Sequence, residues 1–198
     1  MTLRGVGHAF GGRHALHPID LDLERGSLLV VRGANGSGKS TLLRIIAGLL
    51  RPTTGSRACP GTAILLAPGD GARRRDRVCT AVQSAAAVSG GEVPGGVAHL
   101  LEQVHLPASI GGQRVEELSS GQRGRLTLAL ALVVVADLVC LDEPSAHLDA
   151  AGAQVVADVV ARLRAAGRTV VVATHDRVTA PADGVITLEG GRVVEAVV

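Results

Sequence analysis

Residues 33–41 read GANGSGKST and carry the strongest structural signal in the sequence. It fits the pattern G-x-x-x-x-G-K-[ST], with its fixed positions at Gly33, Gly38, Lys39 and Ser40. A loop of this kind binds phosphate groups when it joins a β-strand to an α-helix. The flanks therefore decide whether the match is meaningful, since glycine is abundant in this chain, at 26 of 198 residues.

Both flanks have the required character. Residues 28–31, LLVV, have the length and apolar composition of a short buried strand. Residues 41–48, TLLRIIAG, are expected to form a helix with one apolar face that ends near Gly48. The order strand, glycine loop, helix predicts a P-loop rather than a glycine-rich turn that happens to carry Lys-Ser.

The composition of the loop suits a bound polyphosphate. Gly33, Gly36 and Gly38 allow several backbone N–H groups to point inward, and the new helix directs its positive end to the same place. Lys39 is the only lysine in a chain that otherwise uses arginine. A compact ammonium suits the β- and γ-phosphates better than the planar fork of arginine. The Ser40 hydroxyl is placed to ligate Mg²⁺.

Length and composition set limits on the rest of the chain. At 198 residues it is one compact unit, and with 46% hydrophobic and 1% aromatic residues its core must consist of Leu, Val, Ile and Ala. The net charge is +2 and the arginines are scattered, so no dedicated nucleic-acid surface is expected. The run at residues 73–77, RRRDR, is the exception; a solvated loop is the favoured interpretation, with a partner contact as the alternative.

The sequence predicts neither a zinc site nor secretion nor a membrane span. Cys59, Cys79 and Cys140 are widely spaced and form no C-x-x-C pair, so reduced thiols in a cytoplasm are expected. The N-terminus lacks the apolar stretch of a secretory signal. The longest apolar run, residues 126–141, is interrupted by Asp137 and is better explained as a buried helix followed by a buried strand.

Apolar segments separated by turn signals predict an α/β architecture. The first thirty residues are expected to form β-structure with a turn at Gly11-Gly12. Short parallel-type strands are predicted at residues 28–31, 64–66, 138–141 and 169–173, with helices between them. Residues 69–117 break this pattern with glycine turns and a helix near 97–104. We predict a single domain, residues 1–198, with a three-layer P-loop NTPase core, a β-rich N-terminal subdomain and a small helical subdomain at about 69–135.

A second group of residues lies at the end of a predicted strand. The segment LVCLDEP, residues 138–144, ends its apolar run in two adjacent acids. One carboxylate can enter the shell of a magnesium ion while the next faces the water that attacks the γ-phosphorus. We give the first role to Asp142 and the second to Glu143. Acids after a strand are also common as helix caps, so these roles depend on the P-loop in the same chain.

A third group is LSSGQ, residues 118–122, directly before a predicted helix. Its serines and glycine would place a further set of N–H groups at a helix start. It lies far along the chain from the P-loop, so a single chain cannot easily direct both at one phosphate. Two chains arranged head-to-tail about a two-fold axis can do so. An ordinary cluster of capping serines is the alternative.

The order of these segments resembles the ATP-binding subunits of ABC transporters. Five segments match, at the Walker A, signature, Walker B, D-loop and switch-histidine positions: GANGSGKST, LSSGQ, LVCLDEP, SAHLD at 145–149 and ATHD at 173–176. The resemblance covers essentially the whole chain and makes residues 1–198 a single ABC-type ATPase domain. It implies two such cassettes that enclose two ATP molecules, with the signature of one chain at the γ-phosphate held by the other.

The resemblance also implies roles for individual residues. His175 would contact the γ-phosphate and support Glu143, and it follows a predicted strand, at the sheet edge where ligands bind. Phe10 has the place of an aromatic ring that stacks on adenine, with a core phenylalanine as the alternative. Lys39 is grouped with Glu143 and His175 as catalytic. The residues expected to contact ATP are Phe10, Gly33, Asn35, Gly36, Ser37, Gly38, Lys39, Ser40, Thr41, Ser119, Ser120, Gly121, Gln122 and Asp149, and those expected to bind Mg²⁺ are Ser40 and Asp142.

The sequence departs from the family pattern at two places. Ser120 replaces the first glycine of the usual LSGGQ, which keeps the helix start and the Ser119 hydroxyl. After the strand at 64–66 the family has a glutamine that ligates magnesium and water, whereas residues 67–69 of this chain are Ala-Pro-Gly. Gln83 lies too far downstream to replace it. The missing glutamine predicts weak basal ATPase activity.

We therefore expect an ATP-hydrolysing motor subunit that dimerises on ATP, as a homodimer or heterodimer, and drives conformational change in separate transmembrane permease subunits. It would be cytoplasmic and peripheral on the inner face of the cell membrane, with no nucleic-acid partner. The alternative is a non-transport ATPase of the same class that acts on DNA or ribosomes, but the chain has neither a long coiled-coil insertion nor a second cassette. A small-molecule kinase would leave LSSGQ, Asp149 and His175 unexplained.

Overall fold

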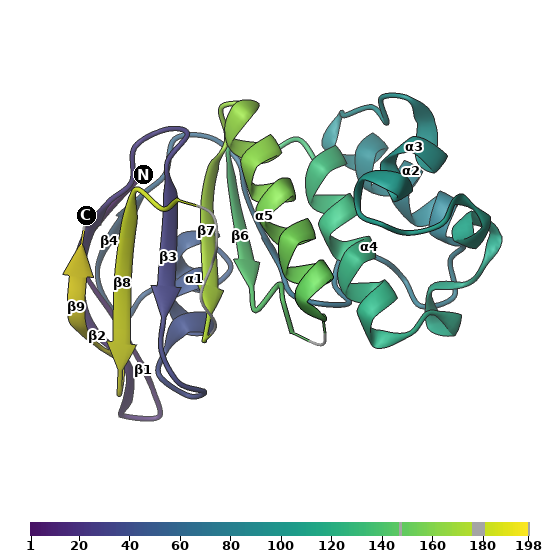
Figure 1. Cartoon of the computed structure of the whole chain (residues 1–198). Helices are drawn as coiled ribbons and strands as arrows, with labels where there is room; N and C mark the ends of the chain where they lie inside the picture. Colours follow the sequence, from purple (N-terminus) through teal and green to yellow (C-terminus); the bar gives the residue numbers. More distant parts are fainter. Residues whose placement is uncertain (147, 176–180, 198) are drawn as a thin grey trace.

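The computed structural model describes residues 1–146, 148–175 and 181–197, so His147 and Asp176 of the quoted motifs lie outside the described residues. Its centre is a six-stranded sheet with the order β5-β6-β7-β3-β8-β9 (Figure 1). The strands are β3 (Leu28–Arg32), β5 (Ala63–Leu66), β6 (Leu138–Asp142), β7 (Thr169–Thr174), β8 (Gly184–Glu189) and β9 (Arg192–Val197). All neighbours pair in parallel except β8 and β9, which are antiparallel. The four predicted parallel-type strands are all confirmed within this sheet.

Helices cover both faces of the central sheet, which explains why its inner strands are apolar on both sides. In β3, Leu29 and Val31 pack in one cluster with helix α1 (Lys39–Ile46), whereas Leu28 and Val30 pack in a second cluster with helix α5 (Ala150–Ala165). Figure 1 shows α1 and α5 on opposite faces of the sheet. The helix predicted at 41–48 is confirmed, although it begins earlier, at Lys39.

A second, antiparallel sheet forms the outer layer beyond α1. Its strands are β1 (Thr2–Phe10), β2 (Arg13–Asp22) and β4 (Thr54–Ala58), in the order β2-β1-β4. Leucine, isoleucine and valine side chains of β1 and β2 share a core cluster with α1 and the central sheet. The predicted β-structure of the N-terminus, with its turn at Gly11-Gly12, is confirmed. The layers are therefore antiparallel sheet, α1, parallel sheet and covering helices.

The helical segment lies at the end of the molecule farthest from β9 (Figure 1). It contains α2 (Val78–Ser89), α3 (Gly96–Gln103), the 3₁₀ helices η1 (Ala108–Gly112) and η2 (Val115–Glu117), and α4 (Ser120–Val133). Apolar side chains of α2, α3 and α4 share one core cluster with α5 and the central sheet. The arginine run at 73–77 forms a loop before α2 with its arginines exposed, as predicted. The subdomain boundaries at 69–135 stay a prediction.

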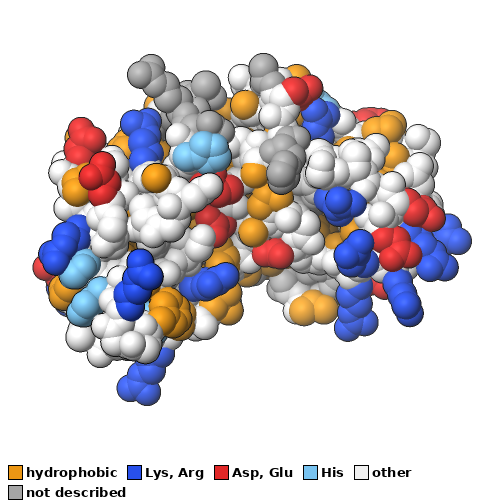
Figure 2. Space-filling model, turned by 90° about the horizontal axis from the view of Figure 1, so that it is seen from below, with side chains coloured by type: hydrophobic (Ala, Val, Ile, Leu, Met, Phe, Trp, Pro, Cys, Tyr) orange, Lys and Arg blue, Asp and Glu red, His pale blue; other side chains and the backbone are white. Residues whose placement is uncertain are grey.

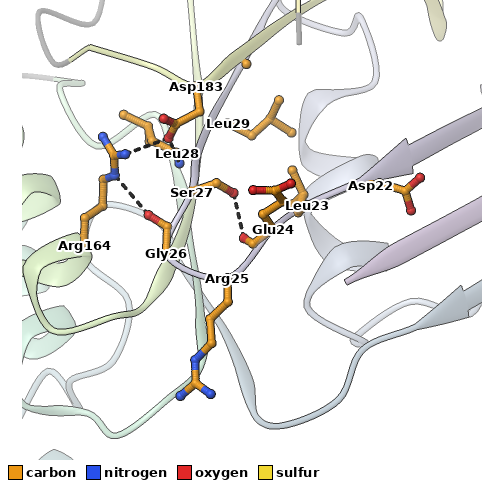
Figure 3. Close-up of a pocket in the computed structure, with 11 residues that line it drawn as sticks. Asp22, Leu23, Glu24, Arg25, Gly26, Ser27, Leu28, Leu29, Arg164 and Asp183 are labelled. Carbon is orange, nitrogen blue, oxygen red and sulfur yellow. Dashed lines mark hydrogen bonds and ion pairs between the residues drawn. The ribbon is translucent and has the colours of Figure 1, made fainter.

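The amino edge of the sheet is fastened by one arginine. Arg164, near the end of α5, pairs with Asp183 at 2.7 Å, and its Nε donates to the Gly26 carbonyl at 3.2 Å. The same carboxylate accepts the backbone N–H of Leu28 at 2.7 Å, beside a cavity of about 580 Å³ (Figure 3). These bonds fix the starts of β3 and β8 at the amino edge. The predicted site lies at the opposite, carboxyl edge, where β3, β6 and β7 end. Across the described ranges, no helix has the length and apolarity needed to traverse a bilayer.

Candidate functional site

The P-loop leaves β3 at the carboxyl edge of the sheet and turns into α1. Two of its glycines are required by space as well as by conformation. Gly33 has φ 150°, and a Cβ there would lie 2.4 Å from the Leu188 carbonyl oxygen; Gly38 has φ 107°, and a Cβ there would lie 2.7 Å from the Ala15 carbonyl oxygen. No larger side chain fits either position, so the backbone curls closely and directs the start of α1 into the site.

The loop encloses a cavity of about 210 Å³. It is lined by Ala15, Asn35, Gly36, Ser37, Gly38, Lys39, Ser40, Thr41 and Glu143. All the P-loop residues predicted to contact ATP line this cavity, except Gly33. Gly33 directly follows β3, at the start of the loop. The lining also includes one acid from another part of the chain, Glu143, which the sequence analysis had placed at the same site.

Lys39 is held at the centre of the loop. It is 5% exposed, and its Nζ donates to the carbonyl oxygens of Gly33 at 2.7 Å and Ala34 at 3.3 Å. Its third neighbour is Glu143, whose Oε1 lies 3.0 Å from Nζ in an ion pair without hydrogen-bond geometry. The ammonium is thus oriented by its own loop and pairs directly with the acid at the wall of the cavity.

Glu143 follows β6 in a backbone conformation that is rare for residues other than glycine, with φ 49°. Its N–H donates to the Ala173 carbonyl at 2.8 Å, which holds the turn against β7. Its Oε2 lies 2.8 Å from Nδ1 of His175 and accepts the His175 backbone N–H at 3.4 Å. The neighbouring ends of β6 and β7 therefore bring Glu143 and His175 together, beside Lys39 at the start of α1. A positive φ such as that of Glu143 is a form of backbone strain that is common at functional sites.

Asp142 ends β6 beside this group. Its Oδ1 is buried and has no hydrogen-bond partner among the described residues. A buried carboxylate oxygen without a donor is costly unless a cation or water meets it. Carboxylate and hydroxyl oxygens are ligands that magnesium accepts. The donor set of Asp142 and Ser40, completed by phosphate oxygens, therefore fits Mg²⁺.

Figure 2 looks onto the carboxyl edge of the sheet: acidic side chains lie near the middle of this face, and Lys and Arg side chains gather toward the helical end.

Phe10 ends β1, is 52% exposed, and is not a core residue. Its ring meets the ring of buried His8 edge-on, with centroids 4.4 Å apart. The β1–β2 hairpin lies against the P-loop, because Ala15 of β2 lines the cavity. The Phe10 ring is exposed and contacts His8, on the hairpin that carries Ala15, so it is available for stacking; that role stays a prediction.

The signature segment begins α4 with a reciprocal cap. The Ser119 hydroxyl accepts the N–H of Gln122 at 3.2 Å, and the Gln122 side-chain oxygen accepts the N–H of Ser119 at 2.8 Å. Ser119 and Ser120 are exposed. Ser119, Gly121 and Gln122 line a separate cavity of about 330 Å³, which shares no residue with the P-loop cavity. As predicted from the sequence, the P-loop and the signature segment of one chain do not line the same cavity.

Asp149 makes bonds within its own chain that the sequence analysis did not predict. It caps α5, with its Oδ1 accepting the N–H of Gly152 at 2.8 Å. The same oxygen lies 3.3 Å from NH2 of Arg125, in α4. Arg125 was not among the predicted site residues. The only sequence signal for it was its position within the first turns of the helix that follows LSSGQ.

The segment that lacks the family's glutamine is a closed turn. The Asp70 carboxylate accepts the N–H of Ala67 at 3.0 Å, and the Thr127 hydroxyl accepts the N–H of Gly69 at 3.0 Å. Thr127 belongs to α4, so the turn is fastened to that helix. Gln83 is exposed on α2 and does not line the P-loop cavity.

Comparison with known proteins agrees with this geometry. A family model described as ABC transporter matches residues 16–146. The macrolide export ATP-binding/permease protein MacB 1/2 of Paracoccus denitrificans is 37% identical, over 98% of this chain and 33% of its own length. The Fe(3+) ions import ATP-binding protein FbpC 1 of Rhodococcus jostii is 35% identical, over 98% of this chain and 61% of its own length. The chain thus spans one third to about three fifths of these two relatives.

A solved structure shares the fold. The dimeric structure of MJ0796, described as a bacterial ABC transporter cassette, superposes with a TM-score of 0.84 and 23% sequence identity. The match covers 98% of this chain and 97% of that one. At this identity the likeness shows the fold alone, a P-loop NTPase of the cassette type.

Proposed function

The chain belongs to the ABC transporter family, and we propose that it is the ATP-binding and ATP-hydrolysing motor subunit of a transporter, dimerising on ATP to move separate membrane subunits. One observation carries the proposal. Lys39, Glu143 and His175, from three different elements, meet at the P-loop cavity, with distances of 3.0 Å between the first two and 2.8 Å between the last two. A structural P-loop turn would not need the acid and the imidazole at the same place.

The triphosphate is held first by the loop itself. The N–H groups at the start of α1 and the Lys39 ammonium supply the positive field, and Lys39 needs little reorganisation because Gly33 and Ala34 already orient it. Phe10 receives the adenine on its exposed face. The binding residues are therefore preorganised, which lowers the entropic cost of binding.

Glu143 acts on the attacking water. His175 holds Oε2, and Oε1 lies 3.0 Å from the Lys39 ammonium. When the phosphate takes over this ammonium, Oε1 orients the attacking water and accepts its proton as the bond from the γ-phosphorus to the leaving oxygen breaks. Ser40 and Asp142 would hold magnesium, which would supply positive charge to neutralise the phosphate oxygens. Lys39 stabilises the charge on the γ-phosphoryl group during transfer.

The second half of each site comes from a second chain. The signature cavity of one chain contains Ser119, Gly121 and Gln122, whose N–H and hydroxyl groups at the start of α4 suit an anion. A head-to-tail dimer, homomeric or heteromeric, brings this cavity to the P-loop cavity of its partner and closes two sites, which are identical in a homodimer.

The proposed partners are transmembrane permease subunits, which select the transported substrate. The relatives' names support this: MacB is described as an ATP-binding/permease protein and FbpC as an import ATP-binding protein. The subunit would be peripheral on the inner face of the cell membrane. A non-transport ATPase that acts on DNA or ribosomes is not favoured by these relatives.

Phosphate release by the purified chain tests the proposal. Because each site needs two chains, the rate per chain should rise with protein concentration in saturating Mg-ATP. Gly121→Asp places an acid where the γ-phosphate is to be held, so it should abolish hydrolysis while leaving ATP binding to the P-loop intact. A rate per chain that is independent of concentration and unaffected by Gly121→Asp would contradict the shared site.

A further inference from the structure

The structure assigns a positioning role to Arg125: it joins the signature segment and the 148–149 segment of one chain into a single rigid unit that meets the second chain. This inference rests on the proposed function, because the unit matters only where two chains share a site. Arg125 does not line the P-loop cavity. It acts through the two segments that it connects.

The guanidinium of Arg125 reaches in two directions at once. Its NH1 donates to the carbonyl oxygen of His105 at 3.0 Å, and its NH2 pairs with Asp149 at 3.3 Å. The side chain of Arg125 is 20% exposed, so it lies between the segments rather than in solvent. A planar fork with fixed N–H directions suits two acceptors on different segments better than a single ammonium.

The anchoring points of this arginine are themselves constrained. His105 has φ 54°, an uncommon conformation for histidine, and its carbonyl oxygen is the one that Arg125 binds. Asp149 is fixed by its second bond, to the N–H of Gly152 at the start of α5. Arg125 therefore connects the end of the α3 segment, α4 and the start of α5.

An apolar contact supports the same connection. Leu148 is partly buried against the core, and it packs between Gly152 of α5 and Gly124 of α4. A Cβ on Gly152 would lie 2.5 Å from the Leu148 Cβ, so this glycine leaves the space that Leu148 occupies. Polar and apolar contacts thus both fasten residues 148–149 to the helix that begins with the signature.

The two connected segments open into one cavity. Ser119 and Gln122 of the signature segment line the 330 Å³ cavity together with Arg125 and Asp149. Asp149 retains 72% side-chain exposure while paired. Both segments are therefore presented together, and a second chain would meet them as one preformed surface. Preformed surfaces bind more tightly because less motion is lost on association.

The test measures ATP-driven dimerisation in a Glu143→Gln background, where slow hydrolysis keeps ATP bound. Arg125→Met should raise the ATP concentration for half-maximal dimerisation about tenfold, the order expected when one charge-assisted contact is lost. Asp149→Asn keeps a good helix cap but removes the charge, and should have a similar effect. Arg162→Met is the matched control, because Arg162 is exposed on α5 and makes no side-chain hydrogen bond among the described residues; it should behave as the parent.

The combination Arg125→Met/Asp149→Asn decides the mechanism. If the pair acts as a unit, the double variant should be no worse than the more severe single variant. ATP binding by the Arg125→Met monomer at low protein concentration should stay within twofold of the parent, which a general loss of structure would not allow. Arg125→Lys should recover part of the lost ATP-driven dimerisation. If Arg125→Met does not fold at the assay temperature, Arg125→Lys and Arg125→Gln replace it in the comparison of single and double variants.

Two outcomes would overturn the inference: parent-like dimerisation by Arg125→Met, or single effects that multiply in the double variant. Failure of the parent itself to dimerise would instead contradict the proposed function, and the inference with it. The two failures are thus distinguishable, since the first requires a parent that dimerises.

Discussion

Replacing Glu143 by Gln should slow hydrolysis and, at the same time, tighten nucleotide binding to the monomer. The structure gives a reason for each effect. Glu143 is the proposed base, so the loss of its carboxylate should reduce the hydrolysis rate by roughly 10²- to 10⁴-fold. It also lies 3.0 Å from the Lys39 ammonium, which an incoming phosphate must recruit. Glutamine removes that competing charge.

The size of the second effect follows from the burial of the pair. The side chain of Lys39 is 6% exposed and that of Glu143 is 22% exposed, so their attraction is screened less than that of a surface pair. A hydrogen bond to a charged group stabilises a protein by about 1.5–3 kcal/mol. The Lys39–Glu143 pair should contribute less, because both residues line the cavity and the pair lacks hydrogen-bond geometry. We therefore take about 1 kcal/mol, which corresponds to roughly fivefold tighter binding.

Equilibrium binding of a fluorescent ADP analogue measures this effect, because ADP lacks the γ-phosphate that a second chain would hold. Phosphate release measures the first. Glu102→Gln is the matched control, since Glu102 is an exposed acid on α3, and both its affinity and its rate should equal those of wild type. Wild-type ADP affinity in Glu143→Gln would refute the competition argument, and a rate loss below tenfold would refute the role of Glu143 as base.

Three further predictions concern the same cavity. Lys39→Ala should abolish ATP binding at micromolar to millimolar nucleotide, because the backbone alone cannot neutralise the triphosphate; retained affinity in an equilibrium binding assay would contradict the phosphate site. Phe10→Ala should weaken ATP binding by roughly 1–3 kcal/mol, the range for loss of one base-stacking contact, whereas Phe10→Tyr should not; equal affinity in both variants would exclude stacking. Ala67→Gln or Pro68→Gln should raise a weak wild-type ATPase rate by restoring a ligand for magnesium and water; robust wild-type turnover with no gain in either variant would refute this, as would a Mg-ATP structure with Gln83 at the metal.

The sequence was most informative where chemistry and spacing restrict the residues. The P-loop, the acids after β6 and the histidine after β7 could be predicted because parallel strands end at one edge, and the structure brings Lys39, Glu143 and His175 together there. The signature could be recognised, and its position at a helix start is confirmed. The proposal of a second chain followed from the distance along the sequence between the P-loop and the signature.

Other features depended on contacts that a linear pattern does not encode. Strands β4, β8 and β9 were not predicted. Strand β9 is exposed along its whole length and β4 is mostly exposed, so neither shows a buried face in the sequence. Strand β8 does have alternate buried residues and was missed. The contact of Ala15 with the P-loop joins residues from separate layers. The pairing of Arg125 with Asp149 depends on how α4 packs beside α5. The closed turn at 67–70 likewise depends on Thr127, far along the chain.

The mass of Glu143→Gln in Mg-ATP, measured by light scattering after size-exclusion chromatography, tests the central claim of a site shared by two chains. We expect a monomer without nucleotide and twice that mass with ATP, with the double variant Lys39→Ala/Glu143→Gln remaining monomeric under both conditions. A Glu143→Gln protein that binds ATP yet keeps the monomer mass at every ATP concentration would contradict the account.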